Sequence, residues 1–451
     1  MKIMALILAA GKGTRMKSDL PKVLFEAAGK PMIDYVVDAA KGVSASEINV
    51  VIGNGAELVR DHLGGKVNFS LQETQRGTGD AVMAAAAEIE RFDGKVLILC
   101  GDMPLIQSET LSKFIEESAD KDVSFISVKV KKPAGYGRVV RGLDDSVLKI
   151  VEEKDAADEE KRINEVNTGI YLCDSKVLFE RLKNIDSNNA QGEYYLTDIV
   201  AEGASAYLAK DENEFIGVNN RAHLANASKL LWQKRAEEHM ANGVSLIDPT
   251  VVYCDDDVVI EADAVIYPNV FLQKGTVIRR GAVVYPGCRI KNSEIGENSE
   301  IKDNCLITDS YVGAKSAIGP MAQLRPGTVL KGENKIGNFV ETKKAEMDIG
   351  SKASHLTYLG DAEIGKDVNI GCGTITCNYD GISKYKTVIG DGVFVGSDVQ
   401  LVAPVTVGEG ALIAAGSTIT KDVPADALGI TRASQKNLEG WVSRWKQKRK
   451  K

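Results

Sequence analysis

From Val259 onward an apolar residue recurs about every six positions, and this period excludes most folds. The first nine hexads read VIEADA, VIYPNV, FLQKGT, VIRRGA, VVYPGC, RIKNSE, IGENSE, IKDNCL and ITDSYV, and each begins with an aliphatic or aromatic residue except the one at Arg289, where Ile290 follows. Six-residue spacing cannot bury one face of an α-helix, but it places one side chain per short strand on the inner wall of a parallel β-helix. A series of β-hairpins, the alternative, would show turns every ~8 to 12 residues.

The hexad register is interrupted in the middle of this region. It returns at Ile364, Ile370, Ile389, Val395, Leu401, Val407, Ile413 and Ile419. We expect loops to leave the wall at the interruptions, which include GSKASHLTYLG, and such loops can carry function. The hexads resemble those of the hexapeptide-repeat acyltransferases, and this resemblance implies a left-handed β-helix.

The first half of the chain has a different texture. Apolar runs (MALILAA, INVVIG, KVLILCGD, VSFISVKV) alternate with helix-like segments at 80–92 and 108–118. This alternation predicts an α/β domain, Rossmann-like with a mainly parallel sheet, over residues 1–221. Residues 222–242 contain no proline or glycine and end at Gly243, which predicts one connecting helix. We therefore expect three parts: 1–221, a connecting helix at 222–243, and the β-helix with a basic tail at 244–451.

Composition excludes several classes of protein. The 451 residues are 44% hydrophobic and 26% charged, and no run reaches the roughly 18 apolar residues of a membrane span. The net charge of -7 argues against a nucleic-acid partner. Seven scattered cysteines without a C-x-x-C pair favour a reducing cytoplasm over disulfides or a zinc site. The apolar stretch at 3–10 is too short for a signal peptide and predicts a buried first strand.

A glycine-rich turn follows that strand in LILAAGKGTRMKSDLPK. Met16 replaces the third glycine of a dinucleotide fingerprint and the Walker spacing is absent, so neither motif fits. A tight turn with solvated cations would explain the glycines alone. The longer string resembles the sugar-nucleotide pyrophosphorylases, and the resemblance implies a phosphate-binding turn. Its residues would be Leu8, Ala9, Ala10, Gly11, Arg15 and Lys22.

Further positions of this half match the same family. Asp102 follows the strand KVLILC, at the end where open α/β sheets bind ligands, although a turn or cap aspartate is the alternative. The resemblance implies that Asp102 and Asn219 hold Mg²⁺, which suits a carboxylate, an amide oxygen and substrate phosphates. It also implies that Gln72, Gly77 and Thr78 read uracil and that Gly137, Glu152 and Asn167 hold an N-acetylated sugar. Taken singly, Gln72 or Asn167 could be a loop residue bonding its own backbone.

The candidate chemistry of the second half centres on His355, the one histidine after residue 243. The strings QLRPG, VETKKA and TCNYDGISKYK lie in the same part of the repeat region. Together with His355 they resemble the acetyltransferase half of the bifunctional N-acetylglucosamine-1-phosphate uridylyltransferase/glucosamine-1-phosphate acetyltransferases. The resemblance implies that glucosamine-1-phosphate is bound by Arg325, Lys343, Tyr358, Asn369 and Lys384. It places acetyl-CoA along Cys372, Asn378, Tyr379, Ser397, Ala415 and Arg432, with Asn378 also facing the sugar pocket. Cys372, where some relatives have a smaller residue, could instead be an inward-packed side chain.

Together these matches imply synthesis of UDP-N-acetylglucosamine by a cytoplasmic homotrimer with Mg²⁺, UTP and acetyl-CoA. His355 would be the general base of acetyl transfer, because imidazole titrates near neutrality, and Tyr379 or backbone N–H groups would stabilise the oxyanion. A single-activity sugar-phosphate nucleotidyltransferase with a regulatory or assembly β-helix is the main alternative. A metal-dependent β-helix enzyme of the carbonic anhydrase kind would need several histidines. The tail WVSRWKQKRKK could contact CoA phosphates or a membrane surface, or remain solvated.

Overall fold

A computed structural model describes residues 1–201 and 203–449 of the chain. The chain divides into two compact units, Met1–Trp232 and Gln233–Lys451. The division lies inside helix α7 (Arg221–Ala241), and Gly243 follows that helix with a φ of 89°. The connecting helix expected from the sequence is therefore present, and both units contribute to it.

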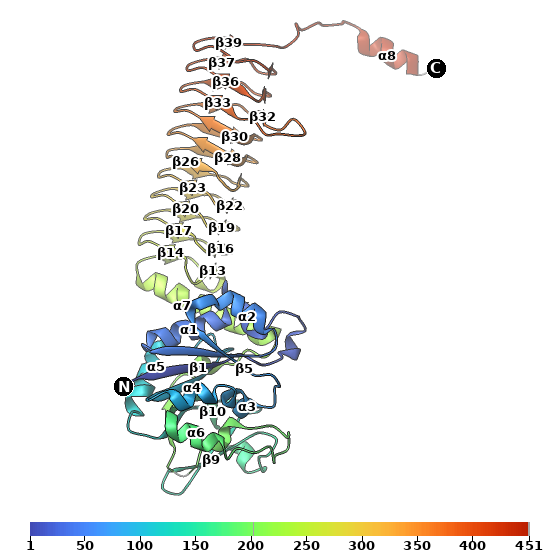
Figure 1. The fold of residues 1–451 in the computed structure, drawn as a ribbon. Helices are drawn as coiled ribbons and strands as arrows, with labels where there is room; N and C mark the ends of the chain where they lie inside the picture. The colour runs from blue at the N-terminus through green and yellow to red at the C-terminus, as the bar shows by residue number, and fades with distance from the viewer. Residues whose placement is uncertain (202, 450–451) are drawn as a thin grey trace. The chain divides into compact units, whose positions relative to one another are not determined.

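The first unit is built on a twisted sheet with strand order β11-β7-β10-β6-β1-β4-β5, and β8 and β9 extend from β10 (Figure 1). Strand β10 runs antiparallel to β6 and β7, while the pairings of β1, β4, β5, β6, β7 and β11 with one another are parallel. The strands are β1 (Ile3–Leu8), β4 (Glu47–Ile52), β5 (Asn68–Leu71), β6 (Lys95–Cys100), β7 (Val123–Lys129), β8 (Arg138–Arg141), β9 (Val147–Val151), β10 (Glu165–Asp174) and β11 (Ser205–Ala209), with a separate hairpin of β2 (Glu26–Ala27) and β3 (Lys30–Pro31). The mainly parallel sheet is thus confirmed.

Helices cover both faces of this sheet, which explains why its strands are continuously apolar. Ala5 and Ile7 of β1 pack on one face with α1, α2 and α5, whereas Met4 and Leu6 pack on the other with α3, α4 and α6. The helices are α1 (Met32–Gly42), α2 (Ala56–Leu63), α3 (Thr78–Met83), α4 (Ala86–Arg91), α5 (Ser108–Glu117) and α6 (Ser175–Leu182). The helix expected over 80–92 is two short helices separated at Ala84 and Ala85.

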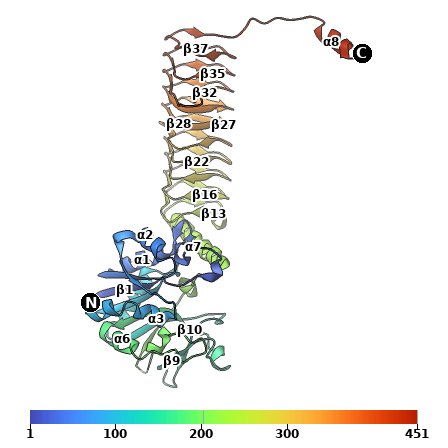
Figure 2. The same cartoon turned by 45° about the vertical axis from the view of Figure 1, so that its right-hand side comes forward.

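The second unit is a β-helix whose coils stack in register (Figure 2). One sheet contains β12 (Ser245–Leu246), β15 (Val265–Ile266), β18 (Val283–Val284), β21 (Glu300–Ile301), β24 (Ala317–Ile318), β27 (Lys335–Asn338), β29 (Lys352–His355), β31 (Asn369–Ile370), β34 (Phe394–Val395), β37 (Leu412–Ile413) and β39 (Leu428–Gly429). The other two faces merge because β28 and β30 each continue around a corner. These faces contain β13 (Val252–Cys254), β14 (Val259–Ile260), β16 (Val270–Gln273), β17 (Val277–Ile278), β19 (Arg289–Lys291), β20 (Glu294–Ile295), β22 (Leu306–Thr308), β23 (Tyr311–Val312), β25 (Gln323–Leu324), β26 (Val329–Leu330), β28 (Glu341–Met347), β30 (Tyr358–Ile364), β32 (Ile375–Cys377), β33 (Thr387–Ile389), β35 (Gln400–Val402), β36 (Val405–Val407) and β38 (Thr418–Ile419).

The residues that point inward differ from those expected in the first coils. Val259 and Phe271, which lead their hexads, are 50% and 43% exposed, while the residues that follow them are buried. The inward positions are Ile260, Ile266, Leu272, Ile278, Val284 and Ile290, after which one five-residue step brings Ile295 inside. The hexad phase proposed from the sequence was therefore wrong by one residue at 259–288. Where two apolar residues are adjacent, the six-residue period alone does not decide which one is buried.

The inner wall also continues through the segment where the register had been expected to break. Its inward residues between 336 and 364 are Ile336, Thr342, Met347, Ala353, Leu359 and Ile364, each at most 3% exposed. His355 thus lies at the end of a regular strand, β29, and the predicted interruption there was wrong. A loop at 378–386, between β32 and β33, does leave the wall (Figure 1).

The C-terminal segment carries α8 (Trp441–Arg449), whose side chains are exposed. Lys450 and Lys451, the end of the basic tail, lie outside the described residues. Among the described residues, no helix is both long and apolar enough to cross a bilayer. The left-handed winding of the β-helix coils stays a prediction.

Candidate functional site

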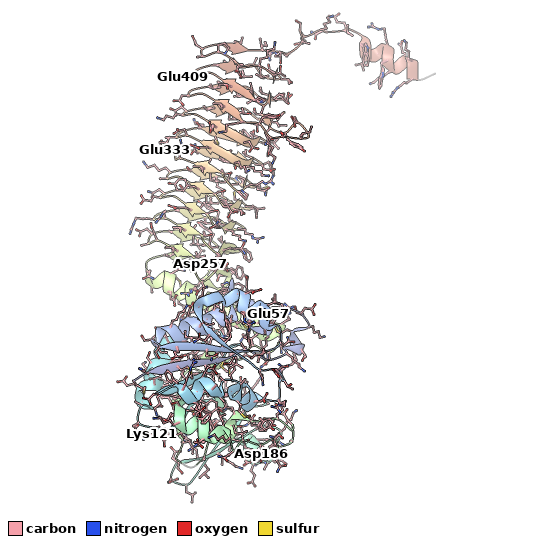
Figure 3. All side chains as sticks on the ribbon, viewed as in Figure 1. Glu57, Lys121, Asp186, Asp257, Glu333 and Glu409 are labelled. Carbon is pink, nitrogen blue, oxygen red and sulfur yellow. The ribbon has the colours of Figure 1, made fainter. Side chains whose placement is uncertain are left out.

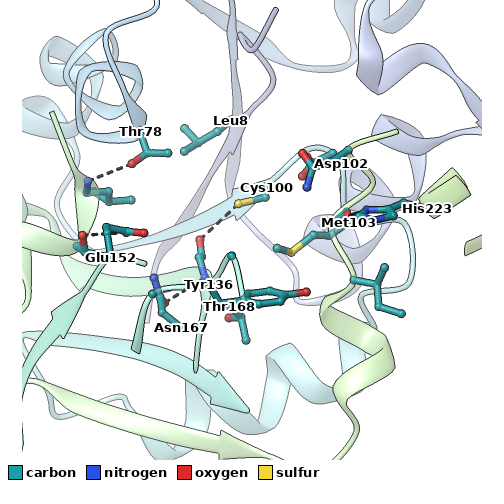
Figure 4. Close-up of a pocket in the computed structure, with 18 of the residues that line it drawn as sticks. Leu8, Thr78, Cys100, Asp102, Met103, Tyr136, Glu152, Asn167, Thr168 and His223 are labelled. Carbon is teal, nitrogen blue, oxygen red and sulfur yellow. Dashed lines mark hydrogen bonds between the residues drawn. The ribbon is translucent and has the colours of Figure 1, made fainter. Parts of the chain in front are cut away.

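A cavity of about 730 Å³ lies at the carboxyl ends of β1 and β6 in the first unit (Figure 4). This is the edge where open α/β sheets bind ligands, because the loops that follow parallel strands gather there. Its wall includes Leu8, Arg15, Thr78, Asp102, Gly137, Glu152, Asn167 and Asn219, all of which the sequence singled out. Residues from seven separate sequence segments therefore meet at one cavity.

Two protein oxygens and two cations converge at one end of this cavity. The Lys22 ammonium forms an ion pair with the Asp102 carboxylate and also donates to Asn219 Oδ1 at 3.4 Å. Arg15 Nη2 donates to the same Asn219 oxygen at 3.0 Å. The backbone explains the convergence, because the Val218 N–H donates to the Asp102 carbonyl at 2.9 Å and so holds the segment that carries Asn219 against Asp102.

This arrangement fits a divalent cation. One ammonium nitrogen contacts both the Asp102 and the Asn219 oxygen, so the two oxygens lie within reach of a single positive centre. Among the described residues, no cluster of three or more His, Cys, Asp or Glu side chains could form a full protein cage. A carboxylate, an amide oxygen and phosphate oxygens are the partial shell that Mg²⁺ accepts, since it keeps several waters.

The glycine-rich turn lies beside the cavity, since Leu8 and Arg15 on either side of it are in the wall. Ala9 and Ala10 are buried, and the Ala9 N–H donates to the Val51 carbonyl at 2.9 Å. Gly13 adopts a left-handed φ of 58°, and a Cβ there would lie 2.8 Å from Cβ of Lys22. Ala9, Ala10, Gly11 and Lys22 do not line the cavity, whereas Leu8 and Arg15 of the same segment do.

The predicted base-reading loop lies beside the wall of the cavity. Gln72 is 5% exposed, and its amide nitrogen donates to Asp80 Oδ2 at 2.7 Å and to the Gly77 carbonyl at 3.3 Å. Thr78 Oγ1 accepts from the Leu196 N–H at 3.1 Å, which joins this loop to a segment more than a hundred residues away. Gln72 and Gly77 are thus placed next to Thr78 but are not themselves in the wall.

The opposite end of the cavity contains the three positions predicted to hold a sugar. The Asn167 N–H donates to the Gly137 carbonyl at 2.9 Å, and the Asn167 amide donates to the Tyr171 hydroxyl at 2.7 Å. Glu152 accepts from the Thr197 hydroxyl at 3.2 Å, and burial raises the pKa of its carboxyl. These side chains present donors and acceptors of the kind that hydroxyl and acetamido groups need.

Several residues of the wall were missed by the sequence reading. They include Cys100, Met103, Tyr136, Tyr171, Thr197 and His223. Burial raises the pKa of the Cys100 thiol to about 12, so this thiol is neutral at physiological pH. Cys100 ends the same strand that precedes Asp102 and could have been found by that signal. Tyr171 and Thr197 belong to segments without a motif, and only the fold brings them to the cavity.

Three predicted phosphate-binding cations gather in the second unit: Arg325 and Lys343 lie on neighbouring coils, and Lys384 lies in the loop at 378–386. Arg325 donates to Glu341 at 2.6 Å. The positive charges of Lys384 and then Arg325 lower the pKa of Lys343 below its ordinary value. Because a lysine pKa falls when like charges are close, the direction of this shift shows that the three cations share one region. Such a region favours a phosphate dianion.

A second group of predicted residues forms a line along the coils. The carbonyl of Cys372 accepts from the Asp398 N–H at 2.7 Å, and the carbonyl of Ser397 accepts from the Gly416 N–H at 2.9 Å. Arg432 Nη1 donates to the Ala415 carbonyl at 3.0 Å. Four of the six residues predicted to bind acetyl-CoA, Cys372, Ser397, Ala415 and Arg432, therefore lie on neighbouring coils at one corner of the β-helix.

His355 lies at the lower end of that line. The carbonyl of its neighbour Leu356 accepts a hydrogen bond from the N–H of Gly373, the residue after Cys372, at 3.0 Å. The His355 carbonyl accepts from the Thr357 hydroxyl at 2.7 Å, which fixes the corner that carries the imidazole. The side chain of His355 itself is exposed.

The remaining predicted residues lie around the 378–386 loop or on another face. Asn378 donates to Asp361 at 2.5 Å, and Tyr358 begins β30 opposite Glu341. The Tyr379 hydroxyl donates to a carbonyl of its own loop at 2.6 Å, so this hydrogen is already used within the chain. Asn369 is on the other sheet, between Lys352 and Phe394.

Comparisons with known proteins agree with this division. A nucleotidyl transferase family model matches residues 4–222, a GMPPB C-terminal domain model matches 250–347, and a model of six bacterial transferase hexapeptide repeats matches 386–421. A bifunctional protein GlmU from Pelobacter propionicus is 50% identical and covers 99% of both chains. Those from Geobacter sulfurreducens and Listeria monocytogenes are 50% and 48% identical and cover 98% and 97% of both chains.

The similarity thus extends over both units and over nearly the whole length of each relative. A nucleotidyltransferase of this family generally uses a divalent metal, and the convergence of Asp102 and Asn219 agrees with that. The chain belongs to the bifunctional GlmU family of transferases, in which a nucleotidyltransferase and a hexapeptide-repeat acetyltransferase in one chain synthesise UDP-N-acetylglucosamine.

Proposed function

We propose that the two reactions are divided between the two halves of the chain. Residues 244–451 transfer acetyl from acetyl-CoA to glucosamine-1-phosphate, and residues 1–221 then transfer uridylyl from UTP to the product and release pyrophosphate. Residues 222–243 connect the two. The observation that carries the proposal is the convergence of Lys22, Asp102 and Asn219 beside a cavity whose other end presents Glu152 and Asn167.

In the first half, a sugar phosphate oxygen attacks the α-phosphorus of UTP and pyrophosphate leaves in line. No protein nucleophile is needed, because phosphoryl-type catalysis consists largely of positioning and charge neutralisation. Arg15 and Lys22 offset the charge of the triphosphate, while Gly137, Glu152 and Asn167 orient the sugar. Asp102 and Asn219 would hold Mg²⁺, which supplies charge stabilisation to the phosphates.

Other groups of this half position the nucleotide. The Ala9 N–H is already bonded to the Val51 carbonyl, so the backbone N–H groups that the turn at 8–11 offers to the phosphates are those of Ala10 and Gly11. Presenting backbone N–H groups is the usual way a small-residue turn binds an anion. Gln72, Gly77 and Thr78 contact the base. The neutral Cys100 thiol lines the cavity and does not add negative charge beside the substrate phosphates.

In the second half, His355 accepts a proton from the amine of glucosamine-1-phosphate as the amine attacks the thioester carbonyl. Arg325, Lys343 and Lys384 bind the sugar phosphate, with Tyr358 and Asn369 beside it. Acetyl-CoA extends along Cys372, Ser397, Ala415 and Arg432, with Asn378 and Tyr379 from the projecting loop. Backbone N–H groups are better candidates than Tyr379 for the oxyanion donor, because the Tyr379 hydroxyl donates to its own loop.

We further propose a cytoplasmic homotrimer that binds small molecules and no nucleic acid. Apolar side chains form an exposed row on one face of the β-helix, with Phe394, Leu412 and Leu428 in register and 46 to 60% exposed. A row of this kind supports burial against another copy of the chain, since monomers rarely leave contiguous apolar surface uncovered. Burial between copies would also place residues of one chain near the acetyl-transfer site of the next.

A single-activity nucleotidyltransferase with an assembly β-helix is the second candidate. The match of residues 250–347 to the GMPPB C-terminal domain model is the observation that favours it. The gathering of Arg325, Lys343 and Lys384 argues against it, because an assembly module does not need concentrated like charge.

A complementation experiment distinguishes the two. Asp102→Ala should abolish uridylyl transfer and keep acetyl transfer, and His355→Ala should do the reverse. A mixture of the two variants should form UDP-N-acetylglucosamine from glucosamine-1-phosphate, acetyl-CoA and UTP, because the intermediate can diffuse between proteins. If His355→Ala alone forms product at the parental rate, the acetyl-transfer assignment is wrong.

A further inference from the structure

The amide of Gln72 is held in one orientation, and this orientation decides which of its atoms can meet a nucleobase. Its nitrogen donates to Asp80 Oδ2 at 2.7 Å and to the Gly77 carbonyl at 3.3 Å. A primary amide nitrogen has two hydrogens, so both are used within the protein. Among the described residues no donor is bonded to the carbonyl oxygen Oε1, so Oε1 is the atom of this amide that remains for a ligand, and it can act only as an acceptor.

Asp80 enforces this orientation because it is itself paired. Arg76 Nε and Nη2 donate to Asp80 Oδ1 at 3.2 and 2.7 Å, and the Arg76 backbone N–H donates to Oδ2 at 3.4 Å. The Asp80 side chain is 8% exposed. A carboxylate paired with a guanidinium accepts hydrogen bonds and donates none, so only the nitrogen of the Gln72 amide can face it.

We propose that the Arg76–Asp80 pair is the specificity-determining element for the base, acting through Gln72. The inference rests on the proposed contact between Gln72 and the base. A fixed acceptor suits a base that carries an N–H at its N3 position, as uracil does, and opposes cytosine, whose N3 is an acceptor. Arg76 and Asp80 are positioning residues, because they act on the ligand through Gln72.

The change Asp80→Asn should reverse this selectivity. The two guanidinium donors of Arg76, at 3.2 and 2.7 Å, outweigh its single backbone N–H at 3.4 Å and keep the acceptor at the position of Oδ1. The new amide nitrogen therefore takes the position of Oδ2 and faces the nitrogen of Gln72. Two donors cannot bond each other, so the Gln72 amide turns over and presents its NH₂ group to the base. We expect kcat/KM for UTP to fall about 10-fold, as for a buried group left without its partner, and kcat/KM for CTP to rise.

A double variant separates orientation from a merely structural effect. In Arg76→Met/Asp80→Asn the new amide is free to rotate, because the guanidinium that fixed it is gone. Its oxygen can then face Gln72 again, and the preference for UTP over CTP should return. Arg60→Met is the matched control, since Arg60 pairs with Glu57 at 3.0 Å on the exposed surface of the same unit and should leave the ratio unchanged.

Steady-state uridylyl transfer with UTP, CTP and 3-deaza-UTP, in the full-length chain, tests the proposal. The unaltered protein should use 3-deaza-UTP about 10-fold less well than UTP, because this analogue lacks the N3–H donor. If Asp80→Asn folds and its ratio of kcat/KM for UTP to kcat/KM for CTP is unchanged, the proposal is overturned. If Asp80→Asn does not fold, equal use of UTP and 3-deaza-UTP by the unaltered protein overturns it instead. If Gln72→Ala uses UTP at the parental rate, the base contact of the proposed function is wrong instead.

Discussion

Gly77 packs against the backbone of Tyr194, which belongs to a distant segment of the nucleotidyltransferase unit. Adding a methyl group at Gly77 should push the two segments apart. Its φ is 125° and its ψ is 177°, a conformation that is open to glycine and strained for other residues. A Cβ at Gly77 would lie 2.4 Å from the Tyr194 carbonyl oxygen, which is backbone and cannot simply rotate away. Gly77→Ala therefore combines backbone strain with a clash.

The size of the effect follows from these two terms. Strain of this kind costs about 1–3 kcal/mol and overpacking about 1–3 kcal/mol more. Gly192→Ala is a matched control, because Gly192 also has a positive φ, 65°, but faces open space, so it should lose only about 1 kcal/mol. The difference of about 3 kcal/mol corresponds to a melting temperature about 6–12 °C lower for Gly77→Ala than for Gly192→Ala in a unit of this size.

Activity should follow the same pattern. The Gly79 N–H donates to the Tyr194 carbonyl at 2.8 Å, and Tyr194 precedes the segment whose Thr197 bonds Glu152. Displacing Tyr194 should therefore weaken binding of both UTP and the sugar phosphate, while acetyl transfer is unchanged. Scanning calorimetry of the full chain measures the melting temperatures. The transition of the nucleotidyltransferase unit is the one that UTP and Mg²⁺ shift to higher temperature. Equal melting temperatures and equal uridylyl transfer for Gly77→Ala and Gly192→Ala would refute this reasoning.

Three further predictions concern other parts of the two sites. Arg138→Met should raise KM for the sugar phosphate severalfold and leave KM for UTP unchanged. The buried guanidinium donates to the Tyr136 carbonyl and to Glu153 at 2.6 Å, and so it holds residues 134–137 in the cavity wall. Equal changes in both KM values would contradict this. Glu152→Gln should stabilise the unit at pH 7 more than at pH 4 in denaturant titrations. Because the pKa of the Glu152 carboxyl is raised in the folded protein, this group stabilises the fold at pH values below its ordinary pKa of 4.5, and that stabilisation is lost as the pH rises. Glutamine does not ionise, so the variant does not lose stability in this way. Lys384→Ala should raise the Lys343 pKa toward its ordinary value in NMR titrations, since Lys384 is the main cause of its lowering.

The sequence predicts the architecture well where one local signal is sufficient. The apolar run at 3–10 becomes the buried β1, and the helix that precedes Gly243 lies within one residue of its predicted start. The β-helix follows from the six-residue period. The position of the buried residue within each hexad does not follow from this period. Pairs such as Val259 and Ile260 contain two apolar residues, and only packing between coils decides that the second is buried.

The candidate sites show the same limit. Asp102 could be predicted because it follows a strand, and the strand end places it at the ligand edge. The cavity wall supplied by Tyr171 and Thr197 could not, since their role depends on hydrogen bonds to Asn167 and Glu152 that exist only in the fold. His355 was expected on a loop, but the coil stays regular there because Ala353 and Leu359 continue the inner wall.

The most direct test of the central claim is a component-omission assay on the full-length chain. Glucosamine-1-phosphate, acetyl-CoA, UTP and Mg²⁺ are supplied together and then each is left out, while UDP-N-acetylglucosamine is followed by mass spectrometry. We predict that product requires all four components, and that N-acetylglucosamine-1-phosphate replaces both glucosamine-1-phosphate and acetyl-CoA. Product formed from N-acetylglucosamine-1-phosphate and UTP, but never from glucosamine-1-phosphate and acetyl-CoA, would contradict the assignment of acetyl transfer to the β-helix.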